Sequence, residues 1–262
     1  GQISSSMVDA SSKAGAEYSF NANVLRIERD GNRVTGVVTQ GSDGEVRHAA
    51  DQIYSTIPLT AALRLMDPPA PEPVQKAAAS IRFRGMILVY LILKTDQFTE
   101  YDAHYFPELS IPISRMSEPK NYNSAKGPKG LTILCAELPC DPGEKWWSMS
   151  DEELGKHYVQ WLNDLGLPVK CEVLRCETRR IGQAYPVYDL DYQRHFETVD
   201  NWLSTLDGFL SFGRQGLFAH DNTHHAFAMA YAASDVLKSD GSLDREAWAA
   251  HRKEFEHHRV ED

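Results

Sequence analysis

The chain has 262 residues, of which 42% are hydrophobic and 24% are charged, and its formal net charge at pH 7 is -10. This composition is typical of a globular protein with one large or two modest domains, and the negative charge argues against nucleic acid as a partner because a phosphate backbone requires a basic surface. The longest apolar run, Met86 to Leu93, has the length of a strand and not the roughly 18 residues of a membrane span, so we expect neither a span nor a secretory signal.

The first ten residues predict a helix, because Ile3, Met7, Val8 and Ala10 recur at helical spacing. The chain enters this helix at once and carries no initiator Met, as the middle of a protein would. We therefore expect a fragment that lacks an N-terminal half. Removal of that half would leave an apolar patch, so we expect the fragment to self-associate or to pair with the missing part.

An antiparallel meander is expected next. The runs at 17–20 and 22–28 have the composition of strands, and the turn at 30–33 joins the second run to an answering strand at 34–39. A second turn at 41–44 leads to a third strand.

The sequence then indicates a passage to a second domain. A short apolar strand at 51–58 ends at a proline, and the proline-rich connection at 67–73 marks a domain crossing. Residues 84–94 predict a long strand whose apolar centre implies burial on both faces. A capping box at 150–153 begins a helix. Further strands are expected at 103–105, 111–116, 130–137 and 169–176, with an exposed loop at 117–129.

The segment from 209 to 225 is the most informative part of the chain. A short buried strand at 209–212 precedes Gly213 and Gly216, which permit close backbone approach, and an alanine-rich helix follows. A helix that begins there directs its free N–H groups and positive dipole end at the turn, which favours an anion or an electron-rich ring. Arg214 adds a fixed positive charge. An ordinary strand-to-helix turn without a ligand is the alternative.

The four cysteines form two Cys-x4-Cys pairs, Cys135 with Cys140 and Cys171 with Cys176. This spacing is looser than that of usual zinc knuckles. We therefore expect buried free thiols, which suit a reducing cytoplasm.

Three histidines lie near the glycine turn. His220 and His224 are one helical turn apart beside His225, a spacing that two ligands of zinc can have. A zinc site needs a further ligand and no H-E-x-x-H pattern is present, so we expect no metal here. These histidines could instead pack in the ordinary way, or lie beside the substrate or the flavin.

The order of elements resembles the FAD-dependent amine-oxidase-like family, which includes protoporphyrinogen oxidase, monoamine oxidase and UDP-galactopyranose mutase. Four segments carry the resemblance: the helix and strand of 1–27, the D-x-V-I-x-T-x-P-like strand at 51–58, the Tyr-Pro segment at 184–188, and the Gly-Arg turn at 213–216 with Asp221 and Asn222. The resemblance extends to about Leu237.

The resemblance implies an α/β fold that combines a partial Rossmann-like FAD domain with a mixed-sheet substrate-binding domain and its flanking helices. We expect residues 1–72 to form part of the FAD-binding domain, 73–207 the substrate-binding domain, and 208–262 the C-terminal FAD-binding segment and helices.

The chain departs from the family in two respects. The G-x-G-x-x-G fingerprint that cradles the pyrophosphate is absent, so most FAD contacts would lie outside this chain. Oxidases of the family carry Gly-Asp in the C-terminal motif, whereas this chain has Gly213-Arg214 as the UDP-galactopyranose mutases do. This difference favours sugar-nucleotide chemistry.

The resemblance also implies roles for single residues, with Val24 meeting the adenosine part of FAD through its backbone. Asp221 or Asn222 could equally serve as the N-cap of the following helix. Arg84 and Arg115 lie at strand ends, where clefts form, and could bind an acidic substrate; the alternative is two exposed strand ends. The cofactor-binding residues implied are Val24, Thr56, Gly213, Arg214, Asp221, Asn222, Thr223 and His224, and the substrate-binding residues are Tyr185, Tyr188, Arg84 and Arg115.

Taken together, these patterns predict part of a cytoplasmic FAD-dependent oxidoreductase or flavin-dependent mutase. This part would shape the pocket for a small molecule, such as a sugar nucleotide, and close one edge of the flavin. No catalytic residue is identified, and alone the chain is expected to be inactive and without FAD. A cofactor-free binding or scaffold module with the same fold is the alternative, and metal-dependent hydrolysis through the histidines is a third hypothesis.

Overall fold

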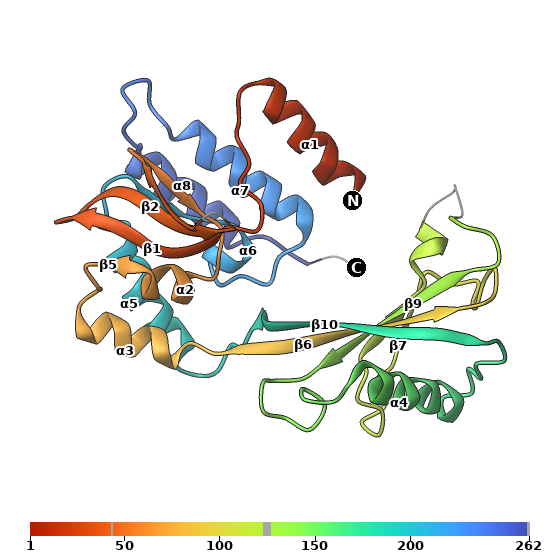
Figure 1. The fold of residues 1–262 in the computed structure, drawn as a ribbon. Helices are drawn as coiled ribbons and strands as arrows, with labels where there is room; N and C mark the ends of the chain where they lie inside the picture. Colours follow the sequence, from red (N-terminus) through yellow and green to blue (C-terminus); the bar gives the residue numbers. More distant parts are fainter. Residues whose placement is uncertain (43, 123–126, 261–262) are drawn as a thin grey trace. The chain divides into compact units, whose positions relative to one another are not determined.

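The computed structural model describes residues 1–42, 44–122 and 127–260. The chain divides into two compact units: unit 1 comprises Gly1–Ile81 and Leu190–Asp262, and unit 2 comprises Arg82–Asp189. In Figure 1, unit 1 therefore carries the red and blue ends of the chain, and unit 2 its middle. Within the described ranges, no helix is both long and apolar enough to cross a membrane.

Unit 1 begins with α1 (Gln2–Lys13), at the position where a helix is expected, and this helix buries none of its residues. A four-stranded sheet follows in the order β3-β2-β1-β5. Its antiparallel meander is joined at one end by a two-residue turn, in which Gly31 has a φ of 56° that glycine adopts without strain. Asp43, within the other predicted turn, lies outside the described residues. The strands are β1 (Asn23–Asp30), β2 (Arg33–Gly41), β3 (Gly44–Ala49) and β5 (Met66–Asp67).

A second sheet in unit 1 has two parallel strands, β4 (Ile53–Ser55) and β11 (Phe209–Ser211), which lie far apart in the sequence. Helices from both stretches of the chain pack together, because α3 contacts α5 and α2 contacts both. The helices of unit 1 after α1 are α2 (Leu59–Arg64), α3 (Glu72–Ser80), α5 (Tyr192–Ser204), α6 (Gly213–Gly216), α7 (Thr223–Asp235) and α8 (Arg245–Phe255).

Unit 2 is built on a five-stranded sheet in the order β10-β6-β9-β8-β7. Every pairing in it is antiparallel. The strands are β6 (Phe83–Leu93), β7 (Ala103–Tyr105), β8 (Arg115–Ser117), β9 (Thr132–Pro139) and β10 (Val173–Pro186), accompanied by the short helix η1 (Pro119–Tyr122) and by α4 (Asp151–Asp164).

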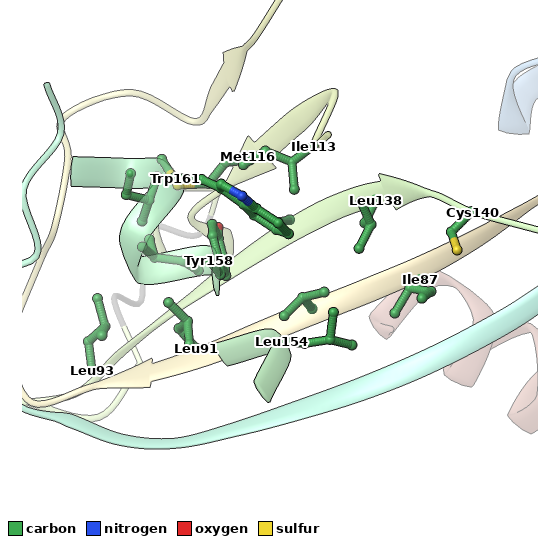
Figure 2. Packing of buried hydrophobic residues seen from close by; sticks show 14 residues of the cluster. Ile87, Leu91, Leu93, Ile113, Met116, Leu138, Cys140, Leu154, Tyr158 and Trp161 are labelled. Atoms are coloured by element: carbon green, nitrogen blue, oxygen red, sulfur yellow. The ribbon is translucent and has the colours of Figure 1, made fainter. Parts of the chain in front are cut away.

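One face of this sheet carries a buried hydrophobic cluster (Figure 2). Ile87 and Leu91 of β6 are fully buried against α4, whose Leu154 and Tyr158 are also fully buried. Burying one such aliphatic side chain contributes about 1.5–3 kcal/mol. The predicted capping box is present: the Ser150 hydroxyl accepts from the Glu153 N–H, and the Glu153 carboxylate accepts from the Ser150 N–H.

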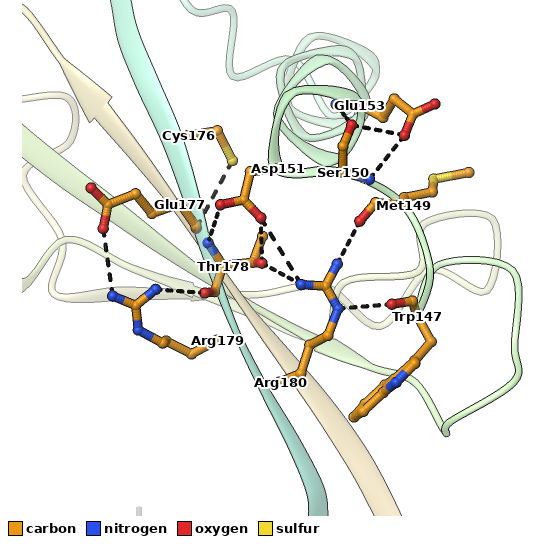
Figure 3. A network of polar contacts seen from close by, with 10 residues as sticks. All are labelled: Trp147, Met149, Ser150, Asp151, Glu153, Cys176, Glu177, Thr178, Arg179 and Arg180. Atoms are coloured by element: carbon orange, nitrogen blue, oxygen red, sulfur yellow. Dashed lines mark hydrogen bonds and ion pairs between the residues drawn. The ribbon is translucent and has the colours of Figure 1, made fainter. Parts of the chain in front are cut away.

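The outer edge of β10 is covered where α4 begins (Figure 3). The Asp151 carboxylate accepts from the Thr178 N–H at 3.2 Å and from the Thr178 hydroxyl at 2.6 Å. Arg180 donates to the carbonyl oxygen of Trp147 at 2.7 Å and also reaches that of Met149. The Asp151 carboxylate thus occupies the Thr178 N–H, which an edge strand would otherwise present to another chain, and Arg180 fastens the segment before α4 to β10.

Several expectations from the sequence differ from the structure. Residues 17–20 form no strand; Tyr18 and Phe20 stack on each other in the open and no neighbouring strand pairs with them. The sheet of unit 2 is antiparallel and not mixed, within an α/β fold that is otherwise as predicted. The predicted loop at 117–129 contains η1, and its residues 123–126 lie outside the described part of the chain.

The predicted burial of β6 on both faces is also wrong. Alternate residues from Ile87 to Leu93 are fully buried, whereas Leu88, Tyr90 and Ile92 are only partly buried. The strand therefore has one face in the core and one apolar face that remains partly open within unit 2.

The compact units place the boundaries at 81/82 and 189/190, not at 72/73 and 207/208. The reason is packing: α3 and α5, which the sequence places in the middle domain, pack on each other in unit 1. The proline-rich connection at 67–73 therefore lies inside unit 1.

Candidate functional site

The parallel strands β4 and β11 bring two distant segments to one edge in unit 1. Ser55 pairs with Ser211, so Thr56 and Phe212 follow at the shared carboxyl end. The N–H of Phe212 donates to the Ser55 carbonyl oxygen at 3.0 Å. Gly213 has a φ of 79°, and a Cβ there would meet nothing closer than the Thr56 side chain at 3.8 Å. Thr56 and Gly213, two predicted cofactor residues, are therefore neighbours.

The turn after β11 is tightly packed around Gly216. A Cβ at Gly216 would lie 2.9 Å from the Ser211 hydroxyl oxygen and 3.2 Å from the Ser55 carbonyl oxygen, so only glycine fits without movement. The Ser211 hydroxyl donates to the Gly216 carbonyl oxygen at 2.9 Å. The glycine turn predicted from the sequence is thus the one-turn helix α6, fixed against β4 and β11.

Phe218, between α6 and α7, has a φ of 52° and is 3% exposed. A non-glycine residue in this region carries backbone strain. Its ring lies 6.1 Å from that of Tyr192 and 6.3 Å from that of Phe196, both on α5. Burial of the ring holds the strained backbone, which redirects the chain from α6 toward α7.

The first turn of α7 is closed by a reciprocal cap. The Asn222 side chain accepts from the backbone N–H of His225, and the Asn222 N–H donates to Nδ1 of His225 at 3.2 Å. Asn222 therefore acts as the N-cap, one of the two roles that the sequence left open for it. The side chains of Thr223 and His224 are exposed at the same helix end.

The structure groups the histidines differently from the sequence-based expectation. His225 is 8% exposed and its ring centroid lies 4.0 Å from that of His224, but His220 is exposed. The further member of the group is His258, which follows α8 and was not singled out from the sequence. Asp221, His225 and His258 form a cluster whose polar atoms lie within 4.8 Å of one another.

Arg214 and Val24 complete the predicted cofactor residues of unit 1. Arg214 lies on α6 and is partly buried. Val24 lies on β1 of the other sheet, opposite Thr39, and is 39% exposed. The role that the resemblance implies for Val24, a backbone contact with the adenosine part of FAD, stays a prediction.

In unit 2, Arg84 is engaged in the fold. Its guanidinium lies 2.7 Å from the Asp141 carboxylate and donates to Glu144 at 2.6 Å and to the Pro139 carbonyl oxygen at 3.0 Å. Hydrogen bonding to Glu144 raises the pKa of Arg84 and lowers that of Glu144. Arg84 therefore ties the loop after β9 to β6, and a substrate contact would compete with two carboxylates.

Tyr185 and Tyr188 lie near the same end of the sheet. Tyr185 is partly buried on β10 and pairs with Arg84 across the ladder, beyond an irregularity that begins at Ile181. Tyr188 is 50% exposed.

Arg115 lies on the partly open face of the sheet. It pairs with the Glu137 carboxylate across from β8 to β9, and its guanidinium lies 5.9 Å from the centre of the Tyr105 ring. Burial acts to lower the pKa of Arg115, but hydrogen bonds to Tyr105 and Glu137 outweigh it and raise the pKa. The Arg115 side chain is thus held in place while 37% of it stays exposed.

Further residues of the open face follow from the strand register. Leu88 pairs with Glu137, Tyr90 with Cys135 and Ile92 with Ile133, and paired residues point to the same side. Tyr90 and Cys135 share a side-chain hydrogen bond, and burial raises the pKa of both. The open face therefore combines apolar side chains with charged ones: the Arg115–Glu137 pair and, on β10, Glu177 with Arg175 and Arg179. Burial alternates along β6, but the sequence does not show this alternation, because the run of apolar residues there is unbroken.

All four cysteines are free, and only Cys140 is fully buried. Burial raises the pKa of Cys140, and it raises that of Cys176 to about 12. These thiols lie in unit 2 and serve its packing.

The comparisons with known proteins agree on one family. A sequence profile described as flavin containing amine oxidoreductase matches residues 1–226. No curated protein matches the chain by sequence. The fold is similar to that of reduced UDP-galactopyranose mutase, with a TM-score of 0.70 and 17% identity over 95% of this chain and 53% of that one.

Two further solved structures are similar. A protein from Exiguobacterium sp. 255-15, described as a candidate protoporphyrinogen oxidase, gives a TM-score of 0.53 at 18% identity over 74% of this chain and 42% of that one. A cofactor-binding redesign of putrescine oxidase gives 0.52 at 14% identity, over 72% and 42%. The chain therefore spans about half the length of its neighbours, and the likeness is one of fold.

Proposed function

Because this chain belongs to the flavin containing amine oxidoreductase family, we propose that it forms the substrate-binding part and one flavin edge of an FAD-dependent oxidoreductase or mutase. The observation that carries the proposal is the parallel pairing of β4 with β11, which brings Thr56 beside Gly213 just ahead of α7. Ligands of open α/β folds bind at the carboxyl ends of parallel strands.

The residues at this edge fit a flavin. Because Gly213 has no side chain, a ligand can approach its backbone closely. Gly216 lets α6 pack directly against β4 and β11. The first turn of α7 presents backbone N–H groups and a positive dipole end, which favour a group that becomes negative on reduction. When bound, FAD would supply the electron-accepting or nucleophilic chemistry. Thr56, Gly213, Arg214 and the backbone of Thr223 and His224 would hold and orient it, with Val24 at the adenosine end.

The partly open face of the unit 2 sheet is the proposed substrate surface. Leu88, Tyr90 and Ile92 give it apolar area, and Arg115 gives it a positive charge held by Glu137. Such a combination suits a small molecule with an apolar or ring portion and an anionic group. A sugar nucleotide meets this description. Arg84 is a weaker candidate because its two carboxylate partners already satisfy it.

The rest of the enzyme would come from a further polypeptide segment. The chain corresponds to 53% of the length of reduced UDP-galactopyranose mutase, and it contains no G-x-G-x-x-G. A parallel sheet of only two strands is rarely stable because parallel strands need neighbours and cover on both faces. We propose that added strands beside β4 and β11, and a surface against the unburied α1, complete the FAD domain. Without them, self-association is expected. The free thiols accord with a cytoplasmic location.

The test is FAD binding by the chain alone and by the chain co-expressed with the coding region upstream of it. We expect flavin absorption bands only in the second preparation. Gly213→Ala should reduce flavin occupancy there, because a side chain would be added at the flavin edge. Gly241→Ala is the matched control, since Gly241 has a similar φ of 83° and also lies in unit 1, but in the loop between α7 and α8.

Absence of flavin from both preparations would contradict the proposal and favour the cofactor-free binding module. Equal loss of flavin in the two glycine variants would show that general destabilisation is responsible, and the assignment of the edge to Gly213 would then fail.

A further inference from the structure

The outer edge of β10 is covered over only part of its length. β10 is the end strand of the unit 2 sheet, and none of the strands in the described ranges pairs with its outer side. In an antiparallel ladder, successive residues direct their N–H and C=O groups alternately toward and away from the neighbouring strand. The Thr178 N–H points outward to Asp151, so the backbone groups of Cys176 point outward as well. The covering contacts involve Thr178 and Arg180, which leaves Cys176 on the uncovered part of the edge.

An apolar groove runs beside this uncovered part. It has a volume of about 480 Å³, and its lining includes Val159 of α4 together with Val173 and Leu174 of β10. Val173 is 37% exposed and Leu174 is 43% exposed. A strand added next to Cys176 would cover these apolar side chains and satisfy the outward backbone groups at the same time.

The charged side chains of this edge alternate in sign. Arg175, Glu177 and Arg179 lie two residues apart and therefore on one side of the strand. The Glu177 carboxylate lies 3.0 Å from Arg175 and 3.7 Å from Arg179. An edge with charges of one sign would repel a second copy of itself, because like charges that lie opposite each other are destabilising. The alternation on β10 allows two copies to attract each other.

One register satisfies both the charges and the hydrogen bonds. If two antiparallel copies of β10 cross at Cys176, the two Cys176 residues exchange N–H···O bonds, and Arg175 of each copy lies opposite Glu177 of the other. A crossing at Glu177 would instead place Glu177 opposite itself and Arg175 opposite Arg179. A crossing at Thr178 is blocked, because Asp151 already accepts the Thr178 N–H.

We propose that residues 173–177 of β10 form a two-fold interface with a second copy of this chain, so that the sheet of unit 2 continues from one copy into the other. The same patch serves both sides of such an interface. The interface involves no residue of unit 1 and no flavin, so it is separate from the proposed function. It also differs from the self-association expected of the unpartnered surfaces of unit 1.

The test combines two measurements on the whole chain. Sedimentation velocity gives the dissociation constant of the dimer, and hydrogen exchange with mass spectrometry of the peptide 173–177 locates the interface. We expect this peptide to exchange more slowly at high protein concentration than at low concentration, because the Cys176 N–H becomes hydrogen-bonded only in the dimer.

Charge reversal tests the register. Glu177→Arg should weaken the dimer roughly tenfold, because both pairs between the copies then join like charges. The double variant Arg175→Glu/Glu177→Arg should restore the original affinity, since the two charges only exchange places. Glu108→Arg is the matched control, because it makes the same change at an exposed residue in the loop between β7 and β8 and should leave the affinity unchanged.

Three results would overturn the inference. The first is exchange of the peptide 173–177 that does not depend on protein concentration, even where the chain dimerises. The second is a double variant that dimerises no better than Glu177→Arg. The third is protection of this peptide only after co-expression with the upstream coding region, which would assign the edge to that polypeptide. The readout needs no flavin, so failure of FAD binding would refute the proposed function and leave this result standing.

Discussion

The two units of this chain are stabilised in different ways. Unit 2 is one continuous stretch whose five-stranded sheet and α4 enclose a common core. Unit 1 is assembled from both ends of the chain, and its strands are divided between a four-stranded sheet and the parallel pair of β4 and β11. Its first helix, α1, buries no residue.

This difference shows how the two proposed tasks depend on the rest of an enzyme. A sheet of five strands covered by a helix can complete its own core. A parallel pair cannot, because its edges and faces need neighbours. We therefore expect unit 2 to have intrinsic stability and unit 1 to gain much of its stability from the further polypeptide that we propose for the FAD domain.

The largest effect is expected from a truncation in the core of unit 2. Leu91→Ala should lower the free energy of unfolding of this unit by about 3–5 kcal/mol, because Leu91 is fully buried and leaves a cavity. Ile3→Ala in α1 is the matched aliphatic truncation in unit 1, and it should change stability by less than about 0.5 kcal/mol since Ile3 is 65% exposed. Denaturant unfolding followed by tryptophan fluorescence measures both. A comparable loss in Ile3→Ala would contradict the picture of an unpartnered α1.

A smaller effect is expected where α4 meets β10. A Cβ at Gly155 would lie 2.7 Å from Cβ of Cys176, which is bound to the backbone and cannot swing away. Gly155→Ala should therefore destabilise unit 2 by about 1–2 kcal/mol, even though alanine is the better helix former. Gly182→Ala is the control within the same unit, because nothing lies within 4 Å of its added Cβ. Thermal unfolding of the two variants would show the contrast, and equal melting temperatures would mean that α4 does not pack this closely.

The parts of the fold that the sequence predicted are those with local signals. The turn at Asp30–Arg33 and the capping box at Ser150 depend on residues a few positions apart, and both are present. The unit boundaries depend on the packing of α3 against α5, which no local pattern reveals. The open face of β6 was missed because partly buried positions there are as apolar as the fully buried ones.

The candidate site follows the same rule. Gly213 was identified from the glycine turn as well as the resemblance, and Thr56 through the resemblance alone; the pairing of β4 with β11 makes them neighbours. Arg84 has the right chemistry for an acidic ligand, yet its partners Asp141 and Glu144 lie in a loop whose position only the folded chain determines. His258 was not predicted for the same reason, since its partner Asp221 is 37 residues away.

Arg84 offers a prediction about acid stability in unit 2. Burial acts to raise the pKa of Asp141, but the hydrogen bond from the Gly85 N–H and the Arg84 cation outweigh burial, so the pKa of Asp141 is lowered. Arg84 also lowers the pKa of Glu144. Carboxyls with lowered pKa values stabilise the fold above their unfolded values and lose this contribution as pH falls through the folded ones. In Arg84→Met, unit 2 should therefore lose less of its free energy of unfolding as the pH falls below about 5. The difference from the unchanged chain should be less than about 1 kcal/mol, because Arg84 and its two carboxylate partners are partly exposed.

The measurement is the melting temperature across this acidic range for the variant and the unchanged chain. Lys76→Met is a control of matched type in unit 1, because Lys76 forms an exposed pair with Glu72 on α3. A parallel acid dependence in the unchanged chain and in Arg84→Met would show that other carboxyls control the acid stability of unit 2.

The smallest perturbation uses thiol chemistry as a reporter of unit 2 alone, since all four cysteines lie between residues 82 and 189. Burial raises the pKa of Cys176 to about 12, so almost none of it is thiolate at neutral pH and alkylation by iodoacetamide should be slow. Leu91→Ala should accelerate modification of Cys176 and of the buried Cys140, because both require local opening of the core that this substitution weakens. His258→Ala, which acts in unit 1, should leave both rates unchanged. Mass spectrometry of the alkylated peptides measures the rates, and faster modification in His258→Ala would mean that the two units share their stability instead of each opening on its own.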